Sequence, residues 1–167
     1  NLVYNGSVQT GVTEGTGYTI TGNTGTGAGD YIATATLENG YIWSGDSTEA
    51  KNISWNIAKK ALTVTAGDKT ITFGDDEPDY TVSYEGFVGG ETETVLGGTL
   101  AFTTGYVKTS YVSELGIVPS GLTSTNYAIT FENGTLTVNK IIISVPVAVD
   151  NLVYNGSVQT GVTEGTG

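Results

Sequence analysis

The chain of 167 residues contains no cysteine, no histidine and no methionine, and its six positive charges are all lysines. The absence of cysteine excludes disulfides, thiol nucleophiles and thiolate metal sites. The absence of histidine removes the commonest general base and the commonest zinc ligand. The remaining residue types would allow a hydrolase that uses a pair of carboxylates, but no pattern in the sequence indicates a cleft for it. We therefore predict that the chain is not an enzyme.

Positive charge is scarce, and the net charge is −11 with a pI of about 4.1. An acidic chain without arginine repels phosphate backbones, so we expect no nucleic acid partner. No apolar run reaches the roughly 20 residues that cross a bilayer, because the longest, 141–149, contains Ser144 and Pro146. We expect no membrane insertion in this segment. The chain starts at Asn1 without an initiator methionine or a leader, which predicts a piece of a longer protein.

Residues that favour strands are abundant, and no stretch has helical periodicity. Alternation of apolar and polar residues is typical of strands that are buried on one face. It predicts strands at 31–38, 53–57, 62–66, 127–131 and 136–138. Trp55, between Ile53 and Ile57 on one face, is expected in a core. Asn-Gly pairs at 5–6, 39–40, 133–134 and 155–156 predict tight turns.

An exact repeat sets the organisation of the chain. The first 17 residues recur unchanged at 151–167, so a repeat of 150 residues (151 − 1) restarts at Asn151. Each repeat is predicted to hold two modules, at 1–58 and 59–140, while 141–167 starts the next repeat. Both modules end in an alternating strand followed by a lysine, Lys59 or Lys140. A new strand then begins with almost no linker, which predicts stiff coupling.

The boundary at 141 predicts how copies assemble. If 141–150 opens the module that continues at Asn151, then the module at 1–58 lacks its own opening strand, which the preceding repeat supplies. An unpaired sheet edge favours pairing with another chain. The expected partner is a neighbouring copy, joined head to tail into a fibre, or the same contact within one longer chain. The predicted assembly strand presents Ile141, Ile143, Val145, Val147 and Val149.

Residues 59–140 resemble the MBG family, the "mostly bacterial immunoglobulin-like" domains of large surface proteins. The segments that match in order are Leu62–Ala66, Phe73–Pro78, Gly86–Thr92, Leu96–Leu100, Gly121–Leu122 and Asn126–Val138. One departure is Ser113-Glu114-Leu115, where the family has Gly-x-Tyr. The resemblance implies an immunoglobulin-like sandwich and brings no catalytic residues.

Residues 1–58 are similar to a second immunoglobulin-like type that accompanies MBG repeats. The resemblance lies in Val3–Gly6, Thr10–Val12, Gly17–Tyr18, Ala28–Tyr31, Trp43 and Trp55. The predicted fold class is therefore all-β, with two consecutive immunoglobulin-like antiparallel β-sandwich modules in a tandem array. The resemblance implies a secreted protein of the bacterial cell surface.

An acidic turn is the candidate metal site. Asp75, Asp76, Glu77 and Asp79 form the densest carboxylate cluster, and calcium takes oxygen ligands of this kind. The spacing does not fit an EF-hand. The simpler alternative is a solvated turn in which Asp75 caps backbone amides and Pro78 fixes the bend.

Tyr41 and Trp43 are the candidate ligand-binding residues, because two aromatic rings of the same parity could form a platform for a surface glycan. The alternative is that both rings pack against the sandwich edge. An isopeptide bond between a lysine and an Asn or Asp would need a buried lysine, and the sequence places none of the six inside.

These features predict a structural repeat unit of an extracellular bacterial surface fibre or adhesin stalk. The modules would provide distance and stiffness through a quasi-linear array. The alternative is a module of a surface adhesin that binds carbohydrate or a host protein. A spacer would bury or scatter Tyr41 and Trp43, whereas a lectin would gather them with polar groups in a concave patch.

Overall fold

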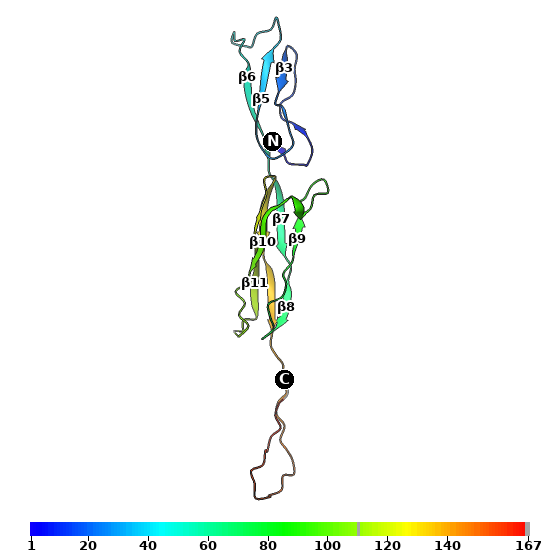
Figure 1. Ribbon diagram of the computed structural model, residues 1–167, viewed down its shortest axis with the longest axis vertical. Helices are drawn as coiled ribbons and strands as arrows, with labels where there is room; N and C mark the ends of the chain where they lie inside the picture. Colours follow the sequence, from blue (N-terminus) through cyan, green and yellow to red (C-terminus); the bar gives the residue numbers. More distant parts are fainter. Residues whose placement is uncertain (110, 166–167) are drawn as a thin grey trace.

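The computed structural model describes residues 1–109 and 111–165 of the chain, and the predicted all-β class is confirmed (Figure 1). The described residues contain strands β1–β13 and one 3₁₀ turn, η1 (Glu93–Val95), and no α-helix. The five strands that alternation predicted are present as β5, β6, β7, β12 and β13. The strands form two groups that share no ladder. We call 1–58 the N-terminal module and 59–140 the second module.

The N-terminal module is built on one four-stranded sheet of order β1-β6-β5-β3, beside a two-stranded sheet of β2 and β4. In β5, Tyr31, Ala33 and Ala35 face inward, while Asp30 and Ile32 face solvent. This period-two pattern is what confines the core to one face. The strands are β1 (Leu2–Val3), β2 (Gln9–Thr10), β3 (Tyr18–Thr21), β4 (Thr24–Gly25), β5 (Gly29–Leu37) and β6 (Lys51–Ala58).

The second module is a sandwich of two sheets, ordered β10-β11-β13-β8 and β12-β7-β9. Its core is a cluster of buried Ala66, Ile71, Ile117, Leu136 and Val138. The opening strand β7 is central to the smaller sheet, and its Leu62 and Val64 are 0 % exposed. The strands are β7 (Lys60–Ala66), β8 (Lys69–Thr72), β9 (Val82–Glu85), β10 (Gly97–Thr103), β11 (Glu114–Thr123), β12 (Tyr127–Glu132) and β13 (Gly134–Asn139).

The four-stranded sheets of the two modules correspond strand for strand. The first strand of each sheet pairs with the last strand of its module, Leu2 with Ile57 and Ile71 with Val138. The next backbone bond is also equivalent, because Tyr4 N donates to Ala58 O at 2.9 Å and Phe73 N to Asn139 O at 2.8 Å. Tyr4 and Phe73 therefore occupy the same position in their modules. Each of these two residues directly follows the first strand of its sheet and lies next to the end of its module, at Lys59 or Lys140.

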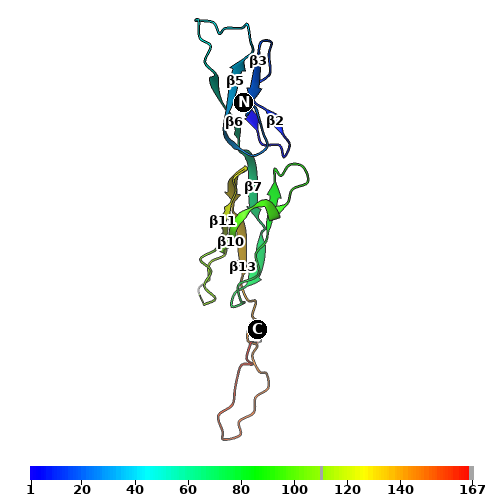
Figure 2. The same cartoon turned by 45° about the horizontal axis from the view of Figure 1, so that its top comes forward.

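Three strand pairs are parallel, which differs from the antiparallel sheets we expected. They are β1–β6, β7–β12 and β8–β13. Parallel pairing arises because the first strands of a module run in the same direction as its last strands. The chain consequently enters a module at one end and leaves at the opposite end, so the modules follow each other along one axis (Figures 1 and 2).

The inward face of the N-terminal module is only partly covered. Its described residues contain no strand equivalent to β7, and Ile53, on the inward face of β6, is 37 % exposed. Trp55 was expected in a core but is only half-buried. Its ring stacks on Tyr31 at 4.4 Å between centroids and lies against Gly11, where an added Cβ would fall within 2 Å of the ring.

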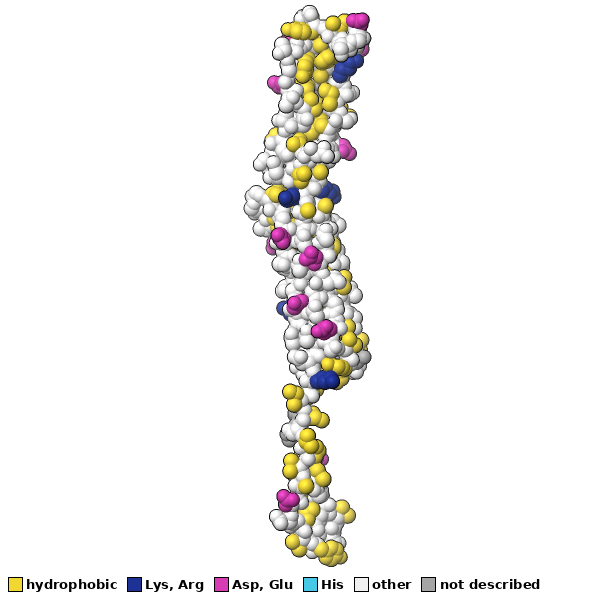
Figure 3. All heavy atoms as spheres, turned by 180° about the vertical axis from the view of Figure 1, so that it is seen from behind, with side chains coloured by type: hydrophobic (Ala, Val, Ile, Leu, Met, Phe, Trp, Pro, Cys, Tyr) yellow, Lys and Arg dark blue, Asp and Glu magenta, His cyan; other side chains and the backbone are white. Residues whose placement is uncertain are grey.

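Residues 141–165 extend beyond the second module as a long loop (Figures 1 and 2). The predicted assembly strand forms no regular strand here: 141–147 has no ladder, and an isolated bridge joins Ala148 to Val162. Ile143 is 70 % exposed and Val145 82 %. The apolar side chains on this segment are visible in Figure 3. Thr166 and Gly167, the end of the repeated segment, lie outside the described residues.

Candidate functional site

The contact between the two modules is the most elaborate site in the described structure. β6 ends at Ala58 and β7 begins at Lys60, so Lys59 is the only residue between them. The Lys59 ammonium donates a hydrogen bond of 2.7 Å to the carbonyl of Ser124, in the loop that precedes β12. A one-residue connection cannot act as a flexible linker. The orientation of the modules is therefore set by the surfaces that meet there.

Two tyrosines from different modules meet at this junction. The rings of Tyr4 and Tyr127 lie edge to face, with centroids 5.5 Å apart and an interplanar angle of 84°. Both hydroxyls donate hydrogen bonds to the same carboxylate, that of Glu91, through its two oxygens. Edge-to-face aromatic pairs are favourable beyond their buried area. Hydrogen bonds to an ionised acceptor are stronger than neutral ones. The carboxylate thus links the first module to the second.

The loop that carries Glu91 is held in place by the second module itself. Glu91 N donates to Val88 O at 2.9 Å, which closes a turn. Val88 N donates in turn to the hydroxyl of Tyr127 at 3.1 Å. The ring of Phe87 packs edge-on against Tyr127, with centroids 5.4 Å apart. Contacts within the second module, none of which involves Tyr4, therefore hold the loop that carries the Glu91 carboxylate.

An apolar cluster surrounds these hydrogen bonds and is shared by both modules. Its buried members are Tyr4 and Ile57 from the N-terminal module and Leu62 and Tyr127 from the second. The partly buried residues packed against them are Leu2, Ala28, Tyr31, Trp55, Tyr84, Phe87, Val88, Leu96 and Ile129. A second polar contact lies at its edge, where Ala28 N donates to Asn126 Oδ1 at 3.0 Å. Together they form a continuous core across the boundary.

The junction perturbs the acidity of both tyrosines. The hydrogen bond to Glu91, followed by burial, raises the pKa of Tyr4 above its usual value. Burial, followed by the hydrogen bond to Glu91, raises the pKa of Tyr127 to about 12. Both causes penalise the phenolate, because it would be desolvated beside a negative carboxylate. The hydroxyls therefore remain protonated donors well above neutral pH.

The acidic turn does not gather its carboxylates. Asp75 Oδ2 accepts from Thr72 N at 2.8 Å, as in a capped turn. Asp76 forms an ion pair with Lys108 at 2.8 Å, which lowers the pKa of Asp76 and raises that of Lys108. Glu77 accepts from the hydroxyls of Tyr80 and Thr104. Over residues 1–109 and 111–165, no group of three acidic side chains is placed to hold a metal. The calcium site stays a prediction without geometric support.

Tyr41 and Trp43 lie in the loop after β5, at the end of the N-terminal module that faces away from the junction. Tyr41 is 50 % exposed, and its ring packs on Gly17, which has φ = +85° and where an added Cβ would lie 2.4 Å from the ring. Trp43 packs beside Tyr18 with centroids 5.5 Å apart, and its Nε1 donates to Glu49 O at 2.8 Å. Glycan binding by this pair stays a prediction.

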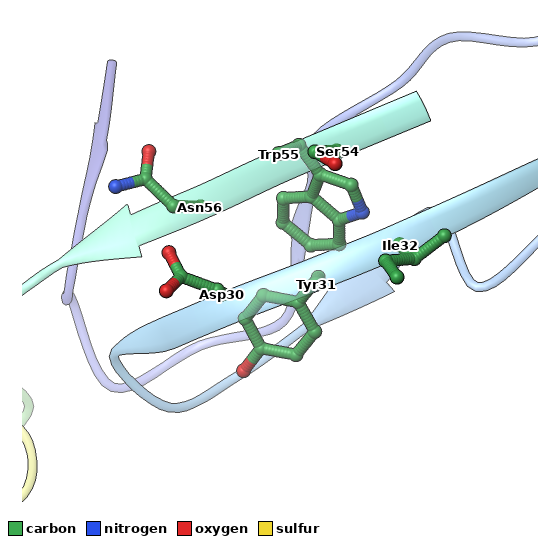
Figure 4. A pocket seen from close by; sticks show the side chains of 6 residues that line it. All are labelled: Asp30, Tyr31, Ile32, Ser54, Trp55 and Asn56. Carbon is green, nitrogen blue, oxygen red and sulfur yellow. The ribbon is translucent and has the colours of Figure 1, made fainter. Parts of the chain in front are cut away.

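An open hollow on β5 and β6 also brings together aromatic and polar side chains (Figure 4). Tyr31 and Trp55 stack there, and Ile32 is 61 % exposed. Asp30 and Asn56 are opposite each other in the ladder, so their side chains lie together on the solvent face. The hollow is shallow, and its aromatic pair already belongs to the module core.

The segment 141–149 pairs with the repeated sequence rather than with the N-terminal module of its own chain. Val149 N donates to Gly161 O, and Thr163 N to Val147 O, at 2.9 and 2.8 Å. The second module has the matching contact, where Gly67 N, just after its opening strand, donates to Thr81 O at 2.9 Å. In the first copy, Gly11 N bonds instead to Asn23 O.

Sequence reasoning missed the junction residues. Tyr4, Glu91 and Asn126 were noted only as parts of family motifs, and nothing in the sequence pairs residues 87 positions apart. The isopeptide geometry is not met either, because no lysine of the described chain is buried. A turn residue followed directly by an aromatic, as in Gly86-Phe87 and Asn126-Tyr127, was the available signal of a packed module end.

Comparison with known proteins gives a family for the second module. Residues 62–137 match the family model described as MBG domain (YGX type). Searches of curated proteins and of solved structures returned no match. Within the described residues, no helix has the length and hydrophobicity needed to cross a bilayer. The matched segment runs from β7 to β13 and therefore includes both sheets of the sandwich, with the Glu91 loop between them. By this match residues 62–137 of the second module are similar to the MBG domain family, a family of structural repeat domains associated with bacterial surface proteins.

Proposed function

We propose that the chain is a structural repeat of an extracellular bacterial surface fibre or adhesin stalk. The observation that carries this proposal is the junction, where a one-residue connection and a shared buried cluster keep two modules in line. Entry and exit at opposite ends mean that each module adds its length to the array (Figure 1). An array of this kind is stabilised by each module and by its contacts with its neighbours.

The match of residues 62–137 to the MBG family supports the bacterial surface as the location. The acidic composition is consistent with an exposed, soluble stalk. On the face that Figure 3 shows, acidic side chains are spread along the second module rather than gathered in one patch. A surface without a concentrated charge or a deep concavity suits a spacer better than a receptor.

Assembly follows from aligning the module ends. When Lys59 is placed on Lys140, the sequences continue without a gap, and Ile143, Val145 and Val147 fall on Leu62, Val64 and Ala66. The last three are buried in β7. We infer that 141–149 is the opening strand of the module that continues at Asn151. It completes that module within one covalent array, or completes the 1–58 module of a separate copy head to tail.

Immunogold labelling of intact bacteria with antibodies against this chain tests the location. We expect gold particles along thin structures outside the cell, spaced at an interval that two modules set. Labelling confined to the interior of sectioned cells would overturn the proposal. Purified chains of one, two and three repeats, imaged by negative stain, should increase in length by equal steps.

The half-exposed Tyr41 is the observation that favours the second candidate, a module that binds carbohydrate or a host protein. Binding of the chain to a glycan array would support it if Tyr41→Ala abolished the signal. A matched Tyr154→Ala variant, which changes an aromatic residue that is 90 % exposed, is the control. Loss of signal in neither variant would leave no role for Tyr41 in ligand recognition.

A further inference from the structure

The free end of the second module carries an apolar hollow that resembles one half of the junction already described. It is lined by Phe73, Tyr111, Lys140, Ile141 and Ile143. The rings of Phe73 and Tyr111 lie 6.1 Å apart, and the Lys140 ammonium sits 5.4 Å from the centroid of Tyr111. Tyr111, Ile141 and Ile143 are 41 %, 52 % and 70 % exposed. Apolar side chains gathered at the end of a module suggest a covered surface.

Three of the four buried positions of the junction have counterparts in this hollow or beside it. Phe73 corresponds to Tyr4 through the equivalent backbone bonds to Asn139 and Ala58. Val138 and Ile143 then correspond to Ile57 and Leu62 by the same alignment. The fourth position is that of Tyr127, which comes from the following module, at the end where the chain enters it and where Tyr127 pairs with Lys60. At the hollow, Tyr111 of the same module lies edge-on to Phe73 but stays 41 % exposed, and no residue of a following module covers it in the described chain.

Tyr41 can supply a ring of this kind, because it lies at the end of the N-terminal module that faces away from the junction with the second module. Tyr127 follows β11 and packs on Phe87 of the Gly86-Phe87 loop. Tyr41 follows β5, the counterpart of β11 in the sheet order, and packs on Gly17 of the Gly17-Tyr18 loop. Gly17 and Gly86 both have positive φ, at +85° and +119°. Each module end thus presents a tyrosine beside a loop that contains a glycine of positive φ, although Tyr127 packs on Phe87 and Tyr41 packs on Gly17 itself.

The polar parts of the two junctions differ consistently. Tyr4 has a hydroxyl, and the loop that meets it supplies Glu91. Phe73 has no hydroxyl, and the stretch that follows the Gly17-Tyr18 loop, residues 18–25, contains no Asp or Glu. A carboxylate facing Phe73 would find no hydroxyl on that ring, so burying it there would be costly. The donor of the Tyr4–Glu91 hydrogen bond is thus missing from Phe73, and a matching acceptor is missing from residues 18–25.

We propose that the hollow at Phe73, Tyr111 and Ile143 is the docking surface for the Tyr41 end of the next repeat of this chain. This inference rests on the proposed stalk and adds that its junctions alternate between two kinds. One kind is fastened by the Tyr4–Glu91–Tyr127 hydrogen bonds, and the other is apolar, with Tyr41 packed on Phe73. The exposed Tyr41 is then an assembly residue rather than a ligand platform.

A two-repeat chain tests the docking, made by continuing the sequence after Gly167 with a second copy of residues 18–150. Tyr41→Ala is introduced either into the first repeat, where the residue is at the free end, or into the second, where it meets the hollow. We expect the second placement to lower the melting temperature clearly, while the first changes it little. Equal shifts from the two placements would overturn the proposal.

Crosslinking gives a readout that does not depend on stability. Because the chain has no cysteine, Phe73→Cys in the first repeat and Tyr41→Cys in the second can be joined by a short bismaleimide. The control places the same two substitutions in the opposite repeats, at the outer ends. We expect internal crosslinking to be about tenfold faster in the first arrangement, because its two thiols share a high local concentration. Equal rates would contradict the docking. Immunogold location on cells does not depend on either result, so failure here would leave the stalk proposal standing.

Discussion

The two modules share a four-stranded sheet but differ in what covers it. In the second module, β7 and its neighbours close the inward face, and Leu62 and Val64 are fully buried. In the N-terminal module the corresponding strand is absent from 1–58, and Ile53 and Trp55 stay partly exposed. The residues that would fill that place, in 141–149, lie exposed at the other end of the chain. On the proposed completion by 141–149, the repeat unit in the sequence and the folding unit in space are out of phase.

The largest expected effect is a difference in stability loss between two equivalent positions, Leu62 in the closed second module and Ile143 in the exposed segment 141–149. Leu62→Ala should lower the free energy of unfolding by about 2–5 kcal/mol, because it opens a cavity in a closed core. Ile143→Ala, the matched control at the equivalent position, should change it by less than about 0.5 kcal/mol, since that side chain is exposed here. Urea unfolding of the two variants measures the difference. A large loss for Ile143→Ala would mean that 141–149 is already packed.

Supplying the missing strand should reduce the contrast between the modules. Residues 141–150 placed before Asn1 should raise the free energy of unfolding of the N-terminal module by about 1–3 kcal/mol. The expected gain is the hydrophobic free energy from burying Ile143, Val145 and Val147, less the conformational entropy lost when the strand becomes ordered. Denaturant titration followed by Trp55 fluorescence reports the N-terminal module. The same extension with Ile143→Asp and Val145→Asp is the control. An equal rise with the control would argue against strand completion.

Removing the shared acceptor should weaken the observed junction. Glu91→Ala leaves the Tyr4 and Tyr127 hydroxyls without their partner, at an expected cost of about 1–3 kcal/mol. Glu114→Ala, at an exposed strand end, is the matched control and should cost little. Thermal unfolding compares the two. The linkage between the modules would be unsupported if both variants melted at the wild-type temperature.

The smallest expected effect is a loss of stability in alkali. The folded-state pKa of Tyr127 is about 12, above the usual 10.0, so the folded state holds its proton more tightly than the unfolded state. Stability from this group is complete below pH 10 and decreases as pH rises from 10 towards 12. Tyr127→Phe should flatten the pH dependence of the melting temperature in that window. An unchanged slope would show that another group causes the alkaline loss.

Period-two alternation was sufficient to predict β5, β6, β7, β12 and β13, because each strand hides one face. It could not predict which sheet a strand joins. Asn133-Gly134 read as a tight turn, yet it separates β12 from β13, which lie in different sheets. Gly134 is buried there, since an added Cβ would lie 2.7 Å from Ala66 O. Sheet membership depends on contacts between distant segments, which local pattern does not contain.

The junction was beyond the sequence for the same reason. Glu91 lies in a glycine-rich loop whose sequence is typical of a solvated turn. Nothing in the residues next to it predicts the hydrogen bonds that its carboxylate accepts from Tyr4 and Tyr127. The repeated 17 residues were the exception, because identity over that length fixed the phase of the array. The matching module ends at Lys59 and Lys140 were also visible, and the equivalent backbone bonds of Tyr4 and Phe73 agree with them.

The parallel pairing of β8 with β13 determines how the second module would bear tension. A pull on a tethered array acts on the start and the end of each module in opposite directions along its long axis. The ladder from Lys69–Leu136 to Thr72–Asn139 would then be sheared, with all of its hydrogen bonds loaded at once rather than opened one by one. Resistance to such a load is governed by the rate of unfolding rather than by equilibrium stability. In the proposed stalk, a module of modest thermodynamic stability would therefore still resist a pull along the array.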